Sequence, residues 1–250
     1  MTKTIALFNQ SGGVGKTTLT MNLGYHLGQR KHRVLLVDID PQASLTTFMG
    51  IEPEELKQTI YESVVGDEPV QVIENINGVD LAPANINLSA AELELVSSLM
   101  REMRLKNALT SIADNYDFIL IDCPPSLGIL TVLSLVAATH VLVPIQTQFK
   151  SFQGTDLLLN TVARLRQAAN RQLKIAGFIP TMFDARTAQE TRTYKAIKEQ
   201  LSPLATVYEP IPRSTVFPDA SEKRIPLALY QPRHPAITIM KKTVEKLEQL

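Results

Sequence analysis

A glycine-rich turn near the amino terminus leads into a predicted helix that begins with a lysine and two threonines. The segment follows a strand-like run and consists of Gly12, Gly13, Val14, Gly15, Lys16, Thr17 and Thr18. Glycines allow backbone N–H groups to converge on an anion, and the amino terminus of the helix adds positive charge. In such a loop the lysine bridges the β- and γ-phosphates and the first hydroxyl binds Mg²⁺. The strict motif has glycine where Gln10 stands, but its second half matches, so the pattern predicts that the chain binds and hydrolyses a nucleoside triphosphate.

Three aspartates lie where predicted strands end. Asp38 and Asp40 follow the second predicted strand, and Asp122 ends the third. Mg²⁺ retains several waters and takes few direct protein ligands, so one hydroxyl with nearby carboxylates suits it. We predict that Thr17, Asp38 and Asp122 form the metal site. We predict Lys16 and Asp40 as catalytic residues, with Asp40 orienting or deprotonating the attacking water. A single aspartate at a strand end is often a helix cap, but three beside a phosphate loop indicate metal chemistry.

Five apolar runs of strand-like composition alternate with segments of helical spacing. They cover residues 4–9, 33–38, 116–122, 140–145 and 174–179. Such alternation requires right-handed crossovers and a mostly parallel sheet, whose ligand crevice lies at the carboxyl ends of the strands. We therefore predict an α/β fold of the P-loop NTPase type, with a twisted sheet flanked by helices on both faces, as a single domain over residues 1–250. Residues 50–80 are less regular, and the proline-rich stretches 203–218 and 226–235 suggest long loops.

The composition excludes several classes of protein. Cys123 is the only cysteine, which excludes disulfides within the chain and metal clusters with two or more cysteines per subunit, and suits the reducing cytoplasm. No apolar run approaches the ~18 residues of a membrane span, and we expect no signal peptide. Residues 1–150 hold 10 Lys and Arg against 16 Asp and Glu, whereas residues 151–250 hold 15 against 9. This asymmetry is consistent with a polyanion-binding face or with ordinary solvated helix faces.

Five short segments follow one another along nearly the whole chain. They are Gly12–Thr18, Val37–Gln42, Ile121–Pro125, Thr181–Asp184 with Arg186 and Thr187, and Ile211–Arg213. In this combination the chain resembles the ParA/MinD group of deviant-Walker ATPases. The resemblance implies ATP and Mg²⁺ as cofactors and a homodimer that holds the nucleotides between two subunits. It also implies that later loops contact the adenine, through Met182, Phe183, Asp184, Pro212 and Arg213. Plain loop packing is the alternative for these residues.

One position departs from the family pattern. Family members have a lysine just before the paired glycines that reaches the nucleotide of the partner subunit, and Ser11 stands there in this chain. Lys150 follows a predicted strand on the crevice side, so we predict that it supplies the missing cation and is catalytic. A solvated surface lysine is the alternative. A missing early lysine together with Lys150 is similar to the branch of the family that distributes carboxysomes in cyanobacteria.

Basic residues recur on a predicted helix and in the loops that follow it. We predict DNA contacts by Arg192, Lys195, Lys198, Arg213, Lys223 and Arg224. Such side chains bind phosphate backbones without reading sequence, and their affinity falls with salt because counterions are released on binding. The resemblance implies the same property, since ATP-loaded dimers of this kind bind nonspecific DNA. A solvated helix face that is partly paired with Glu190 and Glu199 is the alternative.

The resemblance implies a cytoplasmic, nucleoid-associated positioning ATPase. ATP-bound dimers would sit on DNA, and an adaptor of the McdB or ParB type would accelerate hydrolysis near a cargo, which we expect to be the carboxysome. Three alternatives stay open: partition of a plasmid or chromosome, a membrane-associated MinD-like regulator, and a metabolic P-loop ligase or synthetase. Residues 237–250 place their apolar side chains on one helix face, but Glu245, Glu248 and the lack of aromatic residues favour core packing over membrane binding.

Overall fold

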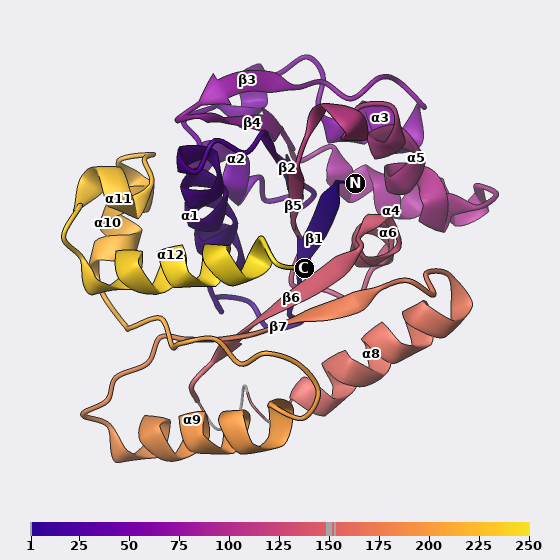
Figure 1. Cartoon of the computed structure of the whole chain (residues 1–250). Helices are drawn as coiled ribbons and strands as arrows, with labels where there is room; N and C mark the ends of the chain where they lie inside the picture. Colours follow the sequence, from indigo (N-terminus) through magenta and orange to yellow (C-terminus); the bar gives the residue numbers. More distant parts are fainter. Residues whose placement is uncertain (1, 149–151, 153) are drawn as a thin grey trace.

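The computed structural model describes residues 2–148, 152 and 154–250. At its centre lies a seven-stranded sheet with the order β3-β4-β2-β5-β1-β6-β7 (Figure 1). The strands are β1 (Lys3–Leu7), β2 (Val34–Asp38), β3 (Ile73–Ile76), β4 (Val79–Ala82), β5 (Phe118–Asp122), β6 (His140–Gln146) and β7 (Lys174–Thr181). Only the pair β3 and β4 is antiparallel among the strands of the described residues. The predicted α/β fold with a mostly parallel sheet is therefore confirmed.

Helices cover both faces of this sheet (Figure 1). One face carries α1 (Lys16–Gln29), α10 (Val216–Glu222), α11 (Leu227–Tyr230) and α12 (Pro235–Leu247). The other carries α3 (Ile60–Val65), α4 (Leu88–Glu94), α5 (Arg104–Thr110), α6 (Ile129–Ala137), α8 (Thr155–Ala168) and the buried side of α9 (Ala188–Leu201). The short helix α2 (Ser44–Phe48) follows β2. Turns of 3₁₀ helix occupy Pro53–Glu55, Leu95–Ser97, Arg101–Met103 and Ala113–Asn115.

Alternation along β1 shows how one strand buries both faces of the sheet. Ile5 and Leu7 pack in the layer of α1 and α12, whereas Ala6 and Phe8 pack in the layer of α5 and α6. All four side chains are fully buried. Parallel strands that helices cover on both sides read as continuous apolar runs, which is why the sequence predicts them well. Burial of each large side chain of this kind contributes about 1.5–3 kcal/mol.

The hairpin of β3 and β4 is an element that the sequence does not predict. Ile76 pairs with Val79, which leaves Asn77 and Gly78 as a two-residue turn with φ of 53° and 85°. Positive φ at both central residues suits an Asn-Gly hairpin turn. Glu74 in β3 is exposed at the sheet edge. The strand therefore lacks the apolar run that marks the central strands.

Two regions that the sequence suggests to be loops contain short helices, α10 and α11. Pro218 lies in the first turn of α10, where the missing N–H would have no helical partner in any case. A proline there starts a helix rather than breaking it. The proline-rich composition is therefore compatible with helix, and the predicted loops are shorter than expected.

The carboxyl-terminal helix α12 packs in the core, as the sequence predicts. Ile237, Met240, Val244 and Leu247 are buried, and the helix lies against α1 (Figure 1). Leu250 lies beyond the end of α12 and is 38% exposed, so the buried face ends at Leu247, three residues earlier than predicted. Within the described part of the chain, no helix combines the length and apolar character that crossing a membrane requires.

Candidate functional site

The glycine loop joins β1 to α1 at the carboxyl ends of the parallel strands. Gly13 and Gly15 have φ of 70° and 92°, in the left-handed region that glycine adopts without strain. A Cβ at either position would meet no described atom within 4 Å, so the backbone conformation rather than packing requires glycine. Gly15 is the N-cap of the 14-residue helix α1, and no side chain caps this end. The first-turn N–H groups of α1 therefore form an anion-binding helix terminus.

The side chain of Lys16 folds back into this loop. It is 6% exposed, and its Nζ donates to Asn9 O at 3.0 Å and to Ser11 O at 3.1 Å. Burial lowers the pKa of the Lys16 ammonium, and the Asp122 carboxylate opposes that shift. On the other side of the loop, Thr181 Oγ1 of β7 donates to Val14 O at 2.9 Å. The loop is thus fixed from β7 as well as from its own strand.

Asp38 and Asp122 end adjacent parallel strands and pair in the register of the sheet. Asp38 is fully buried, and its carboxylate accepts hydrogen bonds from Thr46 N and Thr46 Oγ1 at 2.8 Å each and from Asp40 N at 3.2 Å. Neither carboxylate oxygen of Asp122, which is 1% exposed, has a hydrogen-bond partner among the described residues. Burial raises the pKa of Asp38 to about 6. Burial, with repulsion from Asp38, raises the pKa of Asp122 well above its usual value, and the nearby Thr17 hydroxyl opposes the shift.

An unpartnered buried carboxylate carries a large desolvation cost and calls for a cation. The Thr17 hydroxyl and the Asp122 carboxylate are hard oxygen donors, which suit Mg²⁺ with water and phosphate oxygens as its remaining ligands. Among the described residues, no group of three or more His, Cys, Asp and Glu side chains is placed to hold a metal ion by itself. The residues present therefore fit a Mg²⁺ ion that is bound jointly with a phosphate. Asp38 already accepts three hydrogen bonds, and its contribution to the metal's water shell stays a prediction.

A cavity of about 290 Å³, which we call the loop cavity, opens beside the glycine loop. Its lining consists of Gly12, Gly13, Gly15, Lys16, Thr17, Thr18, Asp40, Gln42, Ser44, Phe48, Pro125 and Met182. Asp40 is partly exposed, and its Oδ1 accepts from Gln42 N at 3.0 Å, which orients the carboxylate. The structure thus brings the predicted catalytic residues Lys16 and Asp40 and the predicted metal ligand Thr17 to one cavity.

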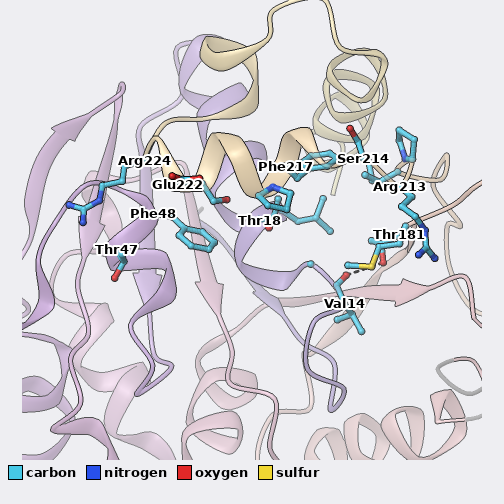
Figure 2. A pocket seen from close by; sticks show the side chains of 17 residues that line it. Val14, Thr18, Thr47, Phe48, Thr181, Arg213, Ser214, Phe217, Glu222 and Arg224 are labelled. Atoms are coloured by element: carbon cyan, nitrogen blue, oxygen red, sulfur yellow. Dashed lines mark hydrogen bonds between the residues drawn. The ribbon is translucent and has the colours of Figure 1, made fainter.

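A larger cavity of about 610 Å³, which we call the apolar cavity, lies next to the loop cavity (Figure 2). Met182, Pro212 and Arg213, which the sequence predicts to contact the base, all line it. The other lining residues are Val14, Gly15, Thr18, Leu19, Thr47, Phe48, Thr181, Ile211, Ser214, Phe217, Pro218, Ser221, Glu222 and Arg224. Figure 2 shows Arg213 and Arg224 at opposite ends of this space. A largely apolar cavity with polar groups at its edges suits a nucleobase and its sugar.

Phe183 and Asp184 line neither of these two cavities, and their predicted contact with the base stays a prediction. The Phe183 ring packs on Tyr194 with the ring centroids 5.3 Å apart, and the Asp184 carboxylate pairs with Arg186 at 2.9 Å. Phe183 N donates to Ile211 O, and Arg213 N donates to Phe183 O. These backbone bonds join the loop after β7 to the loop that carries Arg213.

The sequence does not predict the wall of the apolar cavity that α2 and α10 contribute. Phe48 of α2 lines both cavities, and Phe217 of α10 lines the apolar cavity. Neither belongs to a motif. One signal was present, because Phe217 follows the Ile211–Arg213 segment by only four residues.

The predicted DNA-contacting residues fall into separate areas of one subunit. Arg192, Lys195 and Lys198 are exposed on α9, beside β7, whereas Lys223 and Arg224 lie at the end of α10, beyond α1 (Figure 1). They therefore do not form one continuous patch within a subunit, and their contact with DNA stays a prediction.

Three of the predicted DNA-contacting residues form ion pairs within the subunit. Arg224 pairs with Glu52, and Arg213 pairs with Glu190 at 2.8 Å. Lys195 lies 3.8 Å from Glu199 on the exposed side of α9. The alternative interpretation of the sequence places Glu190 on a solvated helix face. In the structure Glu190 is 5% exposed and therefore does not belong to such a face.

Lys150 lies outside the described residues, so its predicted role is not tested. The serine that stands in the signature lysine's place is described. Ser11 is at the start of the glycine loop, and its N–H donates to Asn9 Oδ1 at 2.9 Å. No cation comes from this position of the loop.

Comparison with known proteins identifies the family. A family model described as an AAA domain matches residues 2–175. The chain is 42% identical over 237 residues to the sporulation initiation inhibitor protein Soj of Bacillus subtilis, and the match covers 93% of each chain. It is 39% identical over 236 residues to the chromosome partitioning protein ParA of Myxococcus xanthus, covering 90% of this chain and 81% of that one. The chain belongs to the ParA/MinD family.

Solved structures of similar proteins agree with this ParA/MinD assignment. Cobyrinic acid a,c-diamide synthase of Mycobacterium smegmatis, solved with ADP and magnesium, is 33% identical and superposes with a TM-score of 0.88, covering 100% of this chain and 95% of the synthase. McdA of Cyanothece superposes with a TM-score of 0.89 without nucleotide and 0.87 as a variant in complex with ATP, at 28% identity. These matches cover 99% of this chain and 100% and 96% of the McdA chains. The resemblance that the five motifs indicate is confirmed.

Proposed function

We propose that this ParA/MinD-family chain binds ATP with Mg²⁺ and hydrolyses it to ADP and phosphate. The observation that carries the proposal is the Asp122 carboxylate, which is buried without a hydrogen-bond partner among the described residues, close to Thr17 and Lys16. This charge requires a cation, and the uncapped end of α1 is suited to a phosphate. The similar proteins solved with ADP and magnesium or with ATP support the proposal.

Residues at the loop cavity and beside it have separate roles in the proposed reaction. Lys16 exchanges its bonds to the carbonyls of Asn9 and Ser11 for bonds to the β- and γ-phosphates. Thr17 and Asp122 would hold Mg²⁺, which would supply positive charge to neutralise the phosphates. Asp40, with its carboxylate oriented by Gln42 N, accepts a hydrogen bond from the attacking water and aligns it with the γ-phosphorus. The adenine occupies the apolar cavity against Met182.

We propose further that the competent state is a homodimer with the nucleotides between two subunits. The loop of each subunit has Ser11 where the family pattern has a lysine, so the site lacks one positive charge of its own. In the proposal Lys150 supplies this charge to the partner's nucleotide. The Lys150→Ala variant should then bind ATP as a monomer and fail to dimerise. A variant that dimerises like the wild type would contradict this role.

The ATP-bound dimer, in this proposal, binds DNA without sequence preference, and an adaptor protein stimulates hydrolysis to release it. The exposed cations Arg192, Lys195 and Lys198 on α9 are the candidate contacts, doubled by the two subunits. Counterion release predicts a steep loss of affinity with salt. This cycle would place the protein on the nucleoid in the cytoplasm.

Two cargoes are supported by different observations. Identities of 39% to 42% with Soj and with the chromosome partitioning protein ParA, over 90% or more of this chain, favour partition of a chromosome or plasmid. Ser11 in place of the signature lysine, and the McdA structures, favour the carboxysome. Affinity capture with the ATP-trapped dimer distinguishes them, because the recovered adaptor is of the ParB type in one case and of the McdB type in the other.

The test combines ATP turnover with retention on random-sequence DNA at low salt. The wild type should hydrolyse ATP slowly and should be retained on DNA with ATP but not with ADP. Asp40→Asn should keep nucleotide binding and DNA retention while turnover falls about 100-fold or more, because only water orientation is lost. Asp114→Asn, at an exposed position in the turn before β5, is the matched control and should behave as the wild type.

The same assays test the alternative that the chain is a metabolic ligase or synthetase. The similarity to cobyrinic acid a,c-diamide synthase supports this alternative. A synthetase turns over ATP only with a small-molecule acceptor and has no use for DNA. ATP turnover that requires such an acceptor, together with no retention on DNA in any nucleotide state, would replace the positioning proposal with a biosynthetic one.

A further inference from the structure

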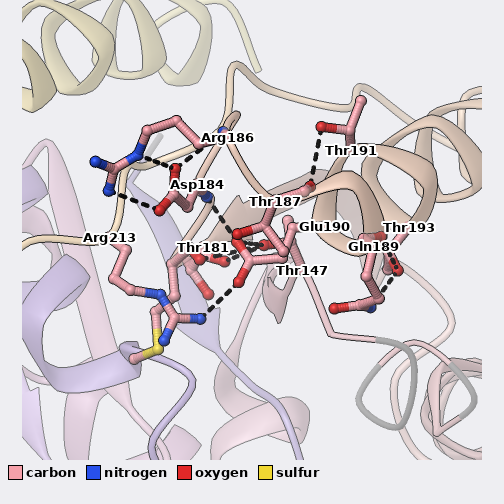
Figure 3. A network of polar contacts seen from close by, with 11 residues as sticks. Thr147, Thr181, Asp184, Arg186, Thr187, Gln189, Glu190, Thr191, Thr193 and Arg213 are labelled. Carbon is pink, nitrogen blue, oxygen red and sulfur yellow. Dashed lines mark hydrogen bonds and ion pairs between the residues drawn. The ribbon is translucent and has the colours of Figure 1, made fainter.

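Glu190 is a buried carboxylate that gathers three separate segments around it (Figure 3). It lies in the first turn of α9 and is 5% exposed. Its Oε1 accepts from Arg213 Nη2 at 2.8 Å, and its Oε2 accepts from Asp184 N at 2.6 Å. Thr147 Oγ1, directly after β6, lies 3.4 Å from the same Oε2. One carboxylate therefore joins the start of α9 to three segments: the residue after β6, the loop after β7 and the loop that carries Arg213.

Two of these segments reach the proposed nucleotide site. Arg213 lines the apolar cavity. Thr147 Oγ1 lies 3.2 Å from Thr181 O and 3.3 Å from Met182 O, and Thr181 in turn donates to Val14 O of the glycine loop. Met182 holds a left-handed φ of 53°, which is strained for a residue with a side chain. The surroundings of Glu190 thus fix the backbone that shapes both cavities.

The helix that carries Glu190, α9, also carries the proposed DNA-binding cations. Arg192, Lys195 and Lys198 are exposed, whereas Ile197 and Leu201 anchor the far end of the helix in the core. At a rise of about 1.5 Å per residue, these cations lie about 3 to 12 Å along the helix from Glu190. The amino-terminal turn of α9 is therefore held mainly by polar contacts that meet at the nucleotide site.

The half-exposed Arg213 guanidinium is the point at which a ligand acts on this arrangement. Its side chain is 49% exposed, while that of Glu190 is 7% exposed. A phosphate or base that draws the guanidinium away leaves a buried carboxylate without its cation, which is strongly unfavourable unless the surrounding segments adjust. Glu190 is part of the first turn of α9, so any adjustment of its backbone shifts that turn. Ligand binding at Arg213 and the position of the first turn of α9 are therefore linked.

We propose that Glu190 is a positioning residue that couples the nucleotide bound at Arg213 to the DNA-binding face on α9. The proposal rests on the ATP-dependent DNA binding proposed above and names its internal link. Linkage is reciprocal: a nucleotide that favours one setting of α9 raises DNA affinity, and DNA raises the affinity for that nucleotide by the same factor.

The experiment compares Glu190→Gln with Glu199→Gln. Both substitutions remove one negative charge from α9, but only Glu190 contacts Arg213, and Glu199 is exposed beside Lys195. For each protein, the dissociation constant for random-sequence DNA is measured with a nonhydrolysable ATP analogue and with ADP, and the ratio of the two is the nucleotide switch. Glu190→Gln should reduce this ratio at least tenfold. Glu199→Gln should tighten DNA binding equally in both states and leave the ratio within twofold of the wild type.

The outcomes separate the coupling from a merely structural role and from the proposed function itself. A Glu190→Gln protein that is less stable yet keeps the wild-type ratio overturns the coupling. Should that variant fail to fold, Arg213→Lys keeps the charge but loses the planar fork, and a ratio equal to the wild type would overturn the coupling as well. If the wild-type protein itself binds DNA equally well with the ATP analogue and with ADP, ATP-dependent DNA binding is refuted, and with it the basis of this inference.

Discussion

Replacing Asp122 by asparagine should stabilise the ligand-free protein at neutral pH and destroy its response to Mg²⁺ and ATP. Both oxygens of Asp122 are buried without a hydrogen-bond partner among the described residues, and Asp38 occupies the paired position on the adjacent strand. Burial raises the pKa of Asp38 from 3.8 to about 6, and burial with repulsion from Asp38 raises the pKa of Asp122 as well. Each carboxylate is therefore harder to ionise in the folded chain than in the unfolded chain.

The sign and size of the pH dependence follow from these shifts. A group whose pKa is raised on folding gives its full stabilisation below its unfolded pKa and loses it as the pH rises through the folded pKa. For Asp38 the loss runs from about pH 4 to about pH 6, and two pKa units correspond to about 3 kcal/mol of unfolding free energy. Asp122→Asn removes the titration of Asp122, whose pKa is raised in the same direction. The variant should therefore match the wild type near pH 4 and exceed it in unfolding free energy at pH 7, with a difference that grows as the pH rises.

Urea unfolding at a series of pH values between 4 and 7.5, in chelator and without nucleotide, measures this difference. Addition of Mg²⁺ and ATP then provides the second arm: the wild type should gain stability, because a ligand that binds only the folded state stabilises it by mass action, whereas the variant should not. Unfolding curves of wild type and variant that stay parallel across the pH range would refute the reasoning about the buried pair. A variant that keeps the full Mg²⁺–ATP response would refute the metal role of Asp122.

Three further predictions concern other parts of the molecule. Gly177→Ala should cost about 3 kcal/mol in urea unfolding, because its Cβ would lie 2.4 Å from Thr206 O at a φ of 145°, whereas Gly50→Ala, which is strained but meets no atom within 4 Å, should cost only about 1 kcal/mol; equal costs would contradict this. Thr181→Val should lose about 1 kcal/mol and weaken the binding of a fluorescent ATP analogue, because the bond to Val14 O is lost, and unchanged affinity would argue against its role in fixing the loop. Lys198→Ala should reduce the salt dependence of DNA binding by about one counterion per subunit, and an unchanged slope would remove this residue from the interface.

The elements that hold the phosphate chemistry are predictable from the sequence because their signals are local. The glycine loop requires positive φ at Gly13 and Gly15, and glycine at both positions indicates this in the sequence. The central strands are apolar throughout since helices cover both of their faces. Asp38 and Asp122 come together because parallel strands place their carboxyl ends at one edge. Each of these inferences needs only a few consecutive residues and one rule of sheet topology.

The apolar cavity and the hydrogen bonds of Glu190 are not predictable in the same way, because they depend on contacts between segments that are distant in the sequence. Phe217 reaches the apolar cavity only after the loop beyond β7 and a short helix are in place. Glu190 looks like an ordinary helix-surface carboxylate in the sequence, yet Arg213, 23 residues later, buries it in an ion pair. The edge strand β3 lacks an apolar pattern because one side of it faces solvent.

The most direct test of the account is the mass of the protein in solution with Mg²⁺ and a nonhydrolysable ATP analogue. The chain has a mass of 27.7 kDa. Size-exclusion chromatography with light scattering should give this mass without nucleotide and twice this mass with the analogue, and Lys16→Ala should stay at the lower value in both conditions. A wild-type protein that binds the analogue tightly and still elutes at 27.7 kDa would contradict the proposal that two subunits share the nucleotides.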